Sequence, residues 1–279
     1  MLTKKVSLKL AVCSWSLQSA SPAHLLDSLK QIGISRIQCA LDPIVNDPKV
    51  WGDFGNFCQK NGIEIVSGMF GTIGEDYSTL ESIKQTGGLV PDGTWEQNWI
   101  HIQKAAQLAA QMGLKLVSFH AGFLPHEKSD PSYAKLVDRI RKVVKLYAQS
   151  GITLAMETGQ ETADTLRSFL ESLQEPNLGV NFDPANMILY DKGEPVAALK
   201  TLAPWIKQCH IKDANRTQKP GTWGEEVVVG TGQVNWSGFF ETLADMNFVG
   251  NGCIEREAGN QRIVDIKSAQ TYITKLINI

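Results

Sequence analysis

The sequence lacks several features that would assign it to a specialised class of protein. No run reaches the roughly 18 apolar residues needed to cross a membrane, and the five cysteines form no CxxC motif. Positive charge is not in excess, because 27 Lys and Arg residues face 29 Asp and Glu residues. We therefore expect neither a membrane nor nucleic acid as a partner. Widely spaced cysteines in odd number favour reduced thiols and a cytoplasmic location.

What is present is typical of a globular chain with a large core. Apolar residues make up 43% and charged residues 20% of the 279 positions, a balance that excludes disorder for the bulk of the chain. Lys4 and Lys5 precede an apolar stretch that loosely resembles a signal peptide. Because Lys9 interrupts that stretch, we interpret it as a first core strand.

Short apolar runs alternate along the chain with longer segments that have helical spacing. The predicted strands span 9–15, 34–40, 63–69, 114–120, 152–157, 178–183, 207–211 and 252–256. The predicted helices span 21–32, 47–61, 95–112, 131–149, 162–173, 194–203, 235–247 and 262–277. Glycine at the end of several helices, such as Gly33 and Gly113, supports these boundaries.

Eight strand–helix units in one chain of this length predict a single-domain (β/α)₈ barrel that spans residues 1–279. A doubly wound open sheet is the alternative. Two insertions interrupt the alternation, at 71–94 after the third strand and at 213–234 after the seventh. Both would lie at the carboxyl ends of the strands, which is the face that carries the chemistry in barrels.

Titratable residues end five consecutive predicted strands. Side chains alternate between the two faces of a strand, and the large apolar residues of these strands would face the helices. We therefore expect the intervening polar residues to point into the barrel at its open end. They are His120, Glu157, Asp183, His210 and Glu255.

Four of these residues form a plausible set of metal ligands. Glu157 and Asp183 are 26 residues apart, Asp183 and His210 are 27 apart, and Glu255 follows 45 residues later. Three carboxylates and one imidazole suit a divalent ion such as Mn²⁺, Mg²⁺ or Co²⁺, with Zn²⁺ as a further candidate. His120 could instead be a core histidine.

Six short segments together resemble the xylose isomerase-like barrel family, which includes sugar and sugar-phosphate isomerases and epimerases. They are Phe119–Gly122 (FHAG), Met156–Gly159 (METG), Asn181–Asn186 (NFDPAN), His210–Asp213 (HIKD), Gly230–Gly232 (GTG) with Trp236, and Ile254–Glu257 (IERE). The resemblance extends over nearly the whole chain. Within the family, the sequence resembles the D-tagatose and D-psicose 3-epimerases.

The resemblance implies one bound divalent ion, Mn²⁺ first among the candidates, on Glu157, Asp183, His210 and Glu255. It also implies that Glu157 and Glu255 are the catalytic acid–base pair. The implied reaction removes a proton next to a carbonyl of a sugar or sugar phosphate and passes through an enediolate. In the family such chains often form dimers or tetramers.

Further residues are candidates for substrate binding. Trp15 and Lys212 are in phase with inward-pointing residues, so one could stack on a sugar and the other could neutralise a substrate oxygen. Arg216 matches an epimerase arginine that contacts the sugar, and Asn186 stands where the family often has a histidine. His120 completes the set with Glu161, which could equally be an acid at a helix N-terminus.

Other functions remain as alternatives. A lyase or dehydratase acting on a keto-sugar or keto-inositol would use the same proton abstraction, and Asn186 makes it a real rival. An apurinic endonuclease with a related barrel would need a histidine-rich site for three zinc ions. The chain has only five histidines and a net charge of −2, and both disfavour this function. A non-catalytic sugar-binding protein is the remaining candidate. The motif 230–232 could cradle a phosphate or form a simple turn.

Overall fold

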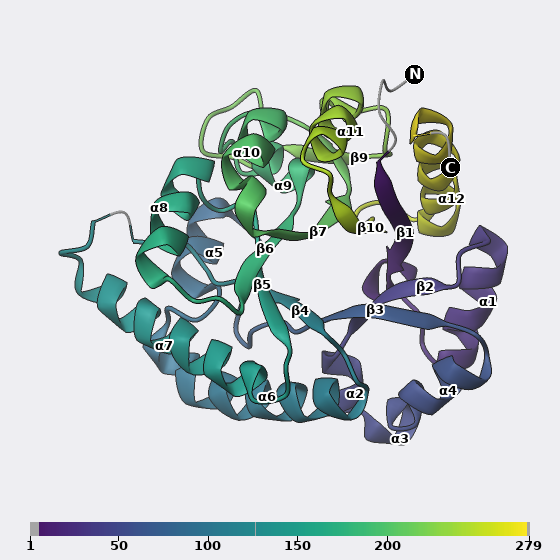
Figure 1. Cartoon of the computed structure of the whole chain (residues 1–279), viewed down its shortest axis with the longest axis horizontal. Coiled ribbons are helices and arrows are strands. Elements are labelled where there is room, and N and C mark those ends of the chain that lie inside the picture. The colour runs from purple at the N-terminus through teal and green to yellow at the C-terminus, as the bar shows by residue number, and fades with distance from the viewer. Residues whose placement is uncertain (1–5, 126, 278–279) are drawn as a thin grey trace.

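The computed structural model describes residues 6–125 and 127–277, so Lys4 and Lys5 lie outside the described residues. Eight parallel strands close into a barrel, and helices surround it (Figure 1). The (β/α)₈ prediction is therefore confirmed, and the open-sheet alternative is wrong. The barrel strands are β1 (Ser7–Cys13), β2 (Arg36–Ala40), β3 (Glu64–Met69), β4 (Leu116–Phe119), β5 (Thr153–Glu157), β6 (Leu178–Phe182), β7 (Ile206–Ile211) and β10 (Val249–Ile254).

The barrel closes where the first strand meets the last. Six residues of β1, from Ser7 to Val12, pair in parallel register with β10, and Figure 1 shows the two strands side by side. The other neighbours follow chain order. All carboxyl ends of the strands therefore open on one side of the molecule, where residues far apart in sequence meet.

The helices begin and end at local signals in the sequence. In α1, the Ser21 side chain accepts a hydrogen bond from the His24 amide, Pro22 occupies the first turn, and Gly33 adopts a left-handed conformation at the end. The other long helices are α6 (Asp92–Gln111), α7 (Pro131–Ala148), α8 (Ala163–Leu173), α10 (Pro195–Leu202), α11 (Trp236–Asp245) and α12 (Arg262–Ile277), with α1 at Pro22–Ile32. No helix in the described part of the chain is long and apolar enough to span a membrane.

The structure differs from the predicted elements in five places. The segment predicted as one helix, 47–61, is two short ones, α3 (Pro48–Trp51) and α4 (Phe54–Lys60), and an unpredicted helix, α2 (Asp42–Asn46), precedes them. The insertion 71–94 contains α5 (Leu80–Thr86), and 213–234 contains an antiparallel hairpin of β8 (Asp213–Asn215) and β9 (Glu225–Val227). A short helix, α9 (Pro184–Leu189), follows β6. The first strand ends at Cys13, so Trp15 lies in a 3₁₀ turn, η1 (Ser14–Leu17); a second such turn, η2 (Ala203–Trp205), precedes β7.

The strands have an apolar outer face and a largely polar inner face. Val117 and Phe119 of β4 belong to the core between strands and helices, as their alternation predicted. Inside the barrel, buried polar side chains form one hydrogen-bonded layer, whose members are Gln38, Ser67, Ser118, Asn181 and Gln208. All five cysteines are buried and free. A polar layer in a barrel interior costs free energy unless its groups are hydrogen-bonded. Gln38 and Asn181 of this layer contact His210, which lies above them.

Candidate active site

Four side chains converge just above the polar layer, at the carboxyl ends of consecutive strands. Glu157 ends β5, Asp183 follows β6, His210 lies on β7, and Glu255 follows β10. One ligand atom from each lies within 4.8 Å of the others, and all four residues are buried. The structure thus brings together the four predicted metal ligands; that they bind an ion remains a prediction.

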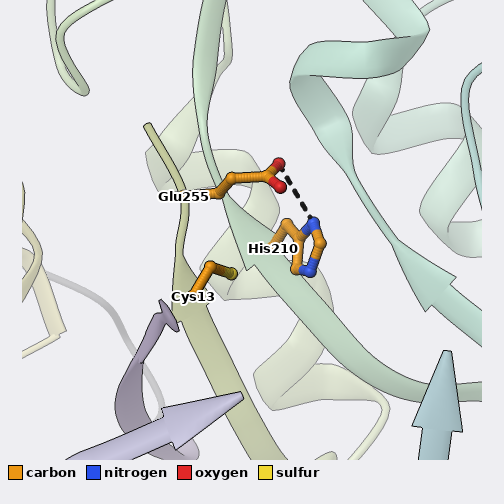
Figure 2. Close-up of side chains that lie close together, drawn as sticks. All are labelled: Cys13, His210 and Glu255. Carbon is orange, nitrogen blue, oxygen red and sulfur yellow. Dashed lines mark ion pairs between the residues drawn. The ribbon is translucent and has the colours of Figure 1, made fainter. Parts of the chain in front are cut away.

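The imidazole of His210 lies at the centre of the cluster. Its Nδ1 lies 3.1 Å from Glu157 Oε1, 3.2 Å from Glu255 Oε2 and 3.6 Å from Asp183 Oδ2. Figure 2 shows the Glu255 carboxylate directed at this nitrogen, with the Cys13 side chain close to the ring. Burial opposes the charged imidazolium, but the carboxylates, Glu255 first, outweigh it and raise the pKa of His210 well above its ordinary value.

The carboxylates of the cluster differ in how strongly they hold protons. Burial alone would raise the pKa of Glu255 and of Glu157, but nearby cations outweigh burial. Lys212 and His210 hold the pKa of Glu255 well below its ordinary value. His210 and His120 lower the pKa of Glu157. For Asp183 burial prevails and raises the pKa to about 6. Burial raises the pKa of the Cys13 thiol well above its ordinary value, which disfavours the thiolate that a metal ligand requires.

The residues of the cluster fit a divalent cation. Four buried atoms make no hydrogen bond of good geometry with the described part of the chain: Glu157 Oε2, Asp183 Oδ2, His210 Nδ1 and Glu255 Oε2. Each of the four residues thus presents, at the place where they meet, one atom that is held by ion-pair contacts and by no hydrogen bond. Buried polar groups are normally bonded, and three carboxylates with one imidazole form a donor set suited to Mn²⁺, Mg²⁺ or Co²⁺.

Asp183 shows how the local fold leaves an atom free. Its Oδ1 accepts hydrogen bonds from the amides of Ala185 (2.7 Å) and Asn186 (2.9 Å), so Asp183 caps the N-terminus of α9. Pro184 occupies the first turn of this helix. The cap fixes the carboxylate and leaves Oδ2 directed at the cluster.

Gln38 on β2 contacts the far side of the His210 ring. Its Oε1 lies 2.8 Å from His210 Nε2, and its Nε2 donates to Ser118 Oγ at 2.7 Å. Asn181 Nδ2 also lies 3.0 Å from His210 Nε2. A neutral imidazole that binds an ion through Nδ1 carries its proton on Nε2, and Gln38 Oε1 is placed to accept a hydrogen bond from that N–H. The polar layer thus supports the orientation of the candidate ligand.

A cavity of about 520 Å³ opens above the cluster. Four of the six predicted substrate-binding residues line it: Trp15, His120, Asn186 and Lys212. Each also contacts a carboxylate of the cluster, as when Trp15 Nε1 donates to Glu255 Oε1 at 2.7 Å. The amide of Asn186 donates to Glu157 Oε1 at 3.1 Å.

His120 and Lys212 contribute positive charge beside the glutamates. His120 Nε2 lies 3.5 Å from Glu157 Oε2, and Lys212 Nζ lies 3.1 Å from Glu255 Oε2. Burial opposes charge on both, yet Glu157 raises the pKa of His120, and Glu255 and Glu257 raise that of Lys212. Each glutamate of the predicted acid–base pair thus has its own cationic neighbour.

The other two predicted substrate-binding residues do not line the cavity. The Arg216 guanidinium pairs with Asp191 and Glu194 near the hairpin. Glu161 accepts a hydrogen bond from the Leu124 amide, and burial raises its pKa to about 7. Their roles in binding remain predictions that this geometry does not favour.

The motif 230–232 forms a turn around a side chain of the protein. Amides of Gly230 and Gly232 donate to Asp213 Oδ2 at 2.8 and 3.2 Å, and Trp236 Nε1 donates to the same oxygen at 3.0 Å. The other oxygen, Oδ1, accepts from the amides of Ala214 and Val234. Asp213 thus takes the donors that a phosphate would have used.

Sequence reasoning missed several residues of the cavity wall. Glu257 follows Glu255 by two residues and so has the same phase, which was a usable signal. Tyr77 and Trp223 come from the two insertions, whose backbone course has no periodic pattern. The remaining missed side chains with polar or aromatic groups are Asp42, Tyr190 and Glu226.

Several known proteins are similar to this chain in sequence or fold. A solved xylose isomerase domain protein from Planctomyces limnophilus is 31% identical, with 98% of this chain and 97% of that chain covered and a TM-score of 0.88. A 3-dehydroshikimate dehydratase from Bacillus anthracis is 34% identical over 121 residues, which cover 42% of this chain and 39% of the relative.

A putative L-ribulose-5-phosphate 3-epimerase from Escherichia coli is 26% identical over 182 residues, covering 62% of this chain and 63% of the relative. The chain thus spans less than two thirds of the length of these curated relatives. The family description "Xylose isomerase-like TIM barrel" matches residues 26–276. On this match and the closed eight-stranded barrel, the chain belongs to the xylose isomerase-like TIM barrel family.

Proposed function

We propose that the chain is a divalent-metal-dependent enzyme that epimerises or isomerises a keto-sugar by proton transfer. The observation that carries the proposal is the position of Glu157 and Glu255. Both carboxylates line the cavity, and both also reach the cluster of candidate metal ligands. A substrate held in the cavity would therefore meet two bases and the bound ion at once.

Glu157 and Glu255 would move the proton. One takes the proton from the carbon next to the carbonyl, which leaves an enediolate, and the other returns a proton to the opposite face. Their lowered pKa values keep a carboxylate available as a base at neutral pH. A divalent ion, Mn²⁺ first among the candidates, would supply positive charge close to the substrate oxygens.

The neighbours of the two glutamates would orient them. Asn186 and His120 contact Glu157, while Trp15 and Lys212 contact Glu255. Each carboxylate is thus fixed by two partners from different strands or loops. Such preorganisation reduces the reorganisation needed when the proton moves.

A lyase is the second candidate, and the comparison with the dehydratase favours it. That relative is more similar to this chain over its matched part than the putative epimerase is, at 34% against 26% identity. Elimination would begin with the same proton abstraction and end with loss of the group on the next carbon. The cavity residues named above would serve either outcome.

The test is an NMR screen of ketoses and keto-sugars in D₂O with Mn²⁺-equilibrated protein, quenched with chelator before measurement. Epimerisation incorporates deuterium and yields a stereoisomer, whereas elimination yields an unsaturated product. We expect Glu157→Gln and Glu255→Gln each to lower the rate at least 100-fold. Glu171→Gln, on the exposed face of α8, is the matched control and keeps the rate. Full exchange in either cavity variant would contradict the proposal.

A further inference from the structure

The charges around the cavity indicate which charged groups on a substrate would be repelled. We propose that the substrate of this site is an uncharged keto-sugar and that phosphorylated and carboxylated sugars are excluded. The inference deepens the proposed function and rests on it for the identity of the site. It is carried by the pairing of the cations, the excess of carboxylates, the closed turn around Asp213 and the aromatic side chains of the cavity wall.

The cations near the cavity are already neutralised. Among the described residues, Lys212 is the one Lys or Arg on the cavity wall. Its Nζ lies 2.7 Å from Glu257 Oε2 and 3.1 Å from Glu255 Oε2. Because the ammonium is buried between two carboxylates, an anionic substrate would have to displace one of them to pair with it.

Arg256, behind the wall, is held in the same way. Its guanidinium donates to Glu226 Oε1 and to Asp265 Oδ2, each at 2.9 Å. Glu226 presents the acidic side of this pair to the cavity. Arg216, the other arginine considered, is paired outside the cavity with Asp191 and Glu194. Each arginine thus contacts two carboxylates.

Carboxylates remain in excess even when a divalent ion is counted. Glu157, Asp183 and Glu255 together carry one negative charge more than such an ion neutralises. Glu257 then cancels Lys212, and Glu226 with Asp265 exceeds Arg256 by one. His120, when charged, offsets only one of these negative charges. The field at the cavity is therefore negative, and it would repel a phosphate or carboxylate group across the short distances of a partly desolvated site.

The place where barrels often bind phosphate is also closed. Loops after the seventh and eighth strands commonly supply backbone amides to a phosphate group. Here the amides of Gly230, Gly232 and Val234 donate to the buried carboxylate of Asp213. A phosphate at this position would lose its donors and would meet a negative charge.

What the wall offers is suited to a neutral sugar. Aromatic side chains from separate loops line the cavity, namely Trp15, Tyr77, Tyr190 and Trp223. Tyr190 and Trp223 pack edge to face, with ring centroids 4.7 Å apart. Such rings present apolar faces to the C–H groups of a sugar, while carboxylates and the Asn186 amide bond its hydroxyl groups. A hydroxyl can donate to a carboxylate, but a phosphate dianion cannot.

The experiment compares matched neutral and phosphorylated sugars by ligand-observed NMR on protein equilibrated with Mg²⁺. The pairs are D-fructose with D-fructose 6-phosphate and L-ribulose with L-ribulose 5-phosphate. We expect the neutral member of at least one pair to bind at least 10-fold more tightly. Glu257→Gln should narrow that preference several-fold, and so should higher ionic strength. Glu194→Gln, which lies outside the cavity, should leave the preference unchanged.

Three results would overturn the inference: tighter binding of the phosphorylated members, equal binding of both, or binding of none of the neutral sugars. Failure of the proposed function has a different signature, because it is measured by deuterium exchange. A neutral sugar that binds without exchange supports the inference and contradicts the proton-transfer function. A phosphorylated sugar that exchanges supports the function and overturns the inference.

Discussion

At the scale of single residues, the site depends on side chains that have two tasks. Asp183 caps α9 with one oxygen and directs the other at the cluster. Gln38 joins the polar layer through its amide nitrogen and accepts from His210 through its oxygen. Because one atom is fixed by the fold, the other is positioned without further cost in side-chain freedom.

Replacement of Gln38 by methionine tests this dependence. Gln38→Met keeps the size of the side chain but removes the acceptor for His210 Nε2, so the ring loses the contact that fixes its tautomer. We expect Mn²⁺ affinity, measured by titration calorimetry, to fall about 10–100-fold. Ser67→Ala is the control, because Ser67 bonds Gln208 in the same layer and does not touch His210. Equal affinities for the two variants would contradict the role given to Gln38.

Glu161 gives a prediction for stability against pH. Burial raises its folded-state pKa to about 7, above the unfolded value, so its contribution is present at low pH and is lost as pH rises through about 7. Glu161→Gln removes this loss, and at pH 8 we expect its free energy of unfolding to exceed that of the wild type by up to about 2 kcal/mol. Urea unfolding at pH 5 and pH 8 measures it. No change in the pH 5 to pH 8 difference between wild type and variant would rule the effect out.

At the scale of elements, barrel strands were predictable because periodicity and strand-end polarity agree. The five inward residues share one phase, and the structure places all five at the open end. The helices α2 and α9 were missed, although Asp42-Pro43 and Asp183-Pro184 are both helix-start signals. A helix of five or six residues is too short to show a helical repeat of apolar residues, so the helix-start signal was the only indication of it in the sequence.

The insertions were located but not described by the sequence. The segments predicted as insertions, 71–94 and 213–234, supply the wall residues Tyr77 and Trp223, which follow no pattern in the sequence. Their positions depend on tertiary contacts such as the Tyr190–Trp223 packing. Arg216 shows the same limit. The family resemblance implied that it contacts the sugar, but its side chain pairs with Asp191 and Glu194 outside the cavity.

The turn around Asp213 should be a major stabilising element of the hairpin region. Asp213→Asn replaces one acceptor oxygen by an NH₂ group that faces backbone donors. We expect the free energy of unfolding to fall by about 2–4 kcal/mol, measured by denaturant titration. Asp130→Asn is the matched control, because Asp130 is an exposed helix cap where asparagine serves equally. A loss in the control as large as that in Asp213→Asn would contradict the assignment.

At the scale of the whole molecule, a bound ion would join four strands. The candidate ligands come from β5, the ends of β6 and β10, and β7, so binding requires the closed barrel. An ion that binds only the folded state stabilises it by about 2.7 kcal/mol at 100 times its dissociation constant. The barrel and the site are therefore coupled in free energy.

This coupling should depend on pH. Burial raises the pKa of Asp183 to about 6, and the pKa of His210 is also raised, so without an ion both hold protons that stabilise the metal-free fold at low pH. An ion must displace these protons, so the rise in Tm caused by Mn²⁺ should be larger at pH 7.5 than at pH 5.5. Scanning calorimetry with Mn²⁺ and with chelator measures it. Asp183→Asn should lose most of the rise, and Asp164→Asn on α8 should keep it.

Closure of the barrel by β1 and β10 also sets when the site can exist during synthesis. Trp15 and Glu255 are hydrogen-bonded although 240 residues separate them, and Ser16 and Arg256 are hydrogen-bonded at the same separation of 240 residues. At about 5–20 residues per second, a ribosome needs roughly 10–50 s to deliver Glu255 after it has begun the chain. Glu157, Asp183 and His210 are made before it and have no fourth partner until it appears. The last ligand to be translated is thus the one whose strand completes the fold, so that a fragment ending before β10 would have neither the barrel nor the site.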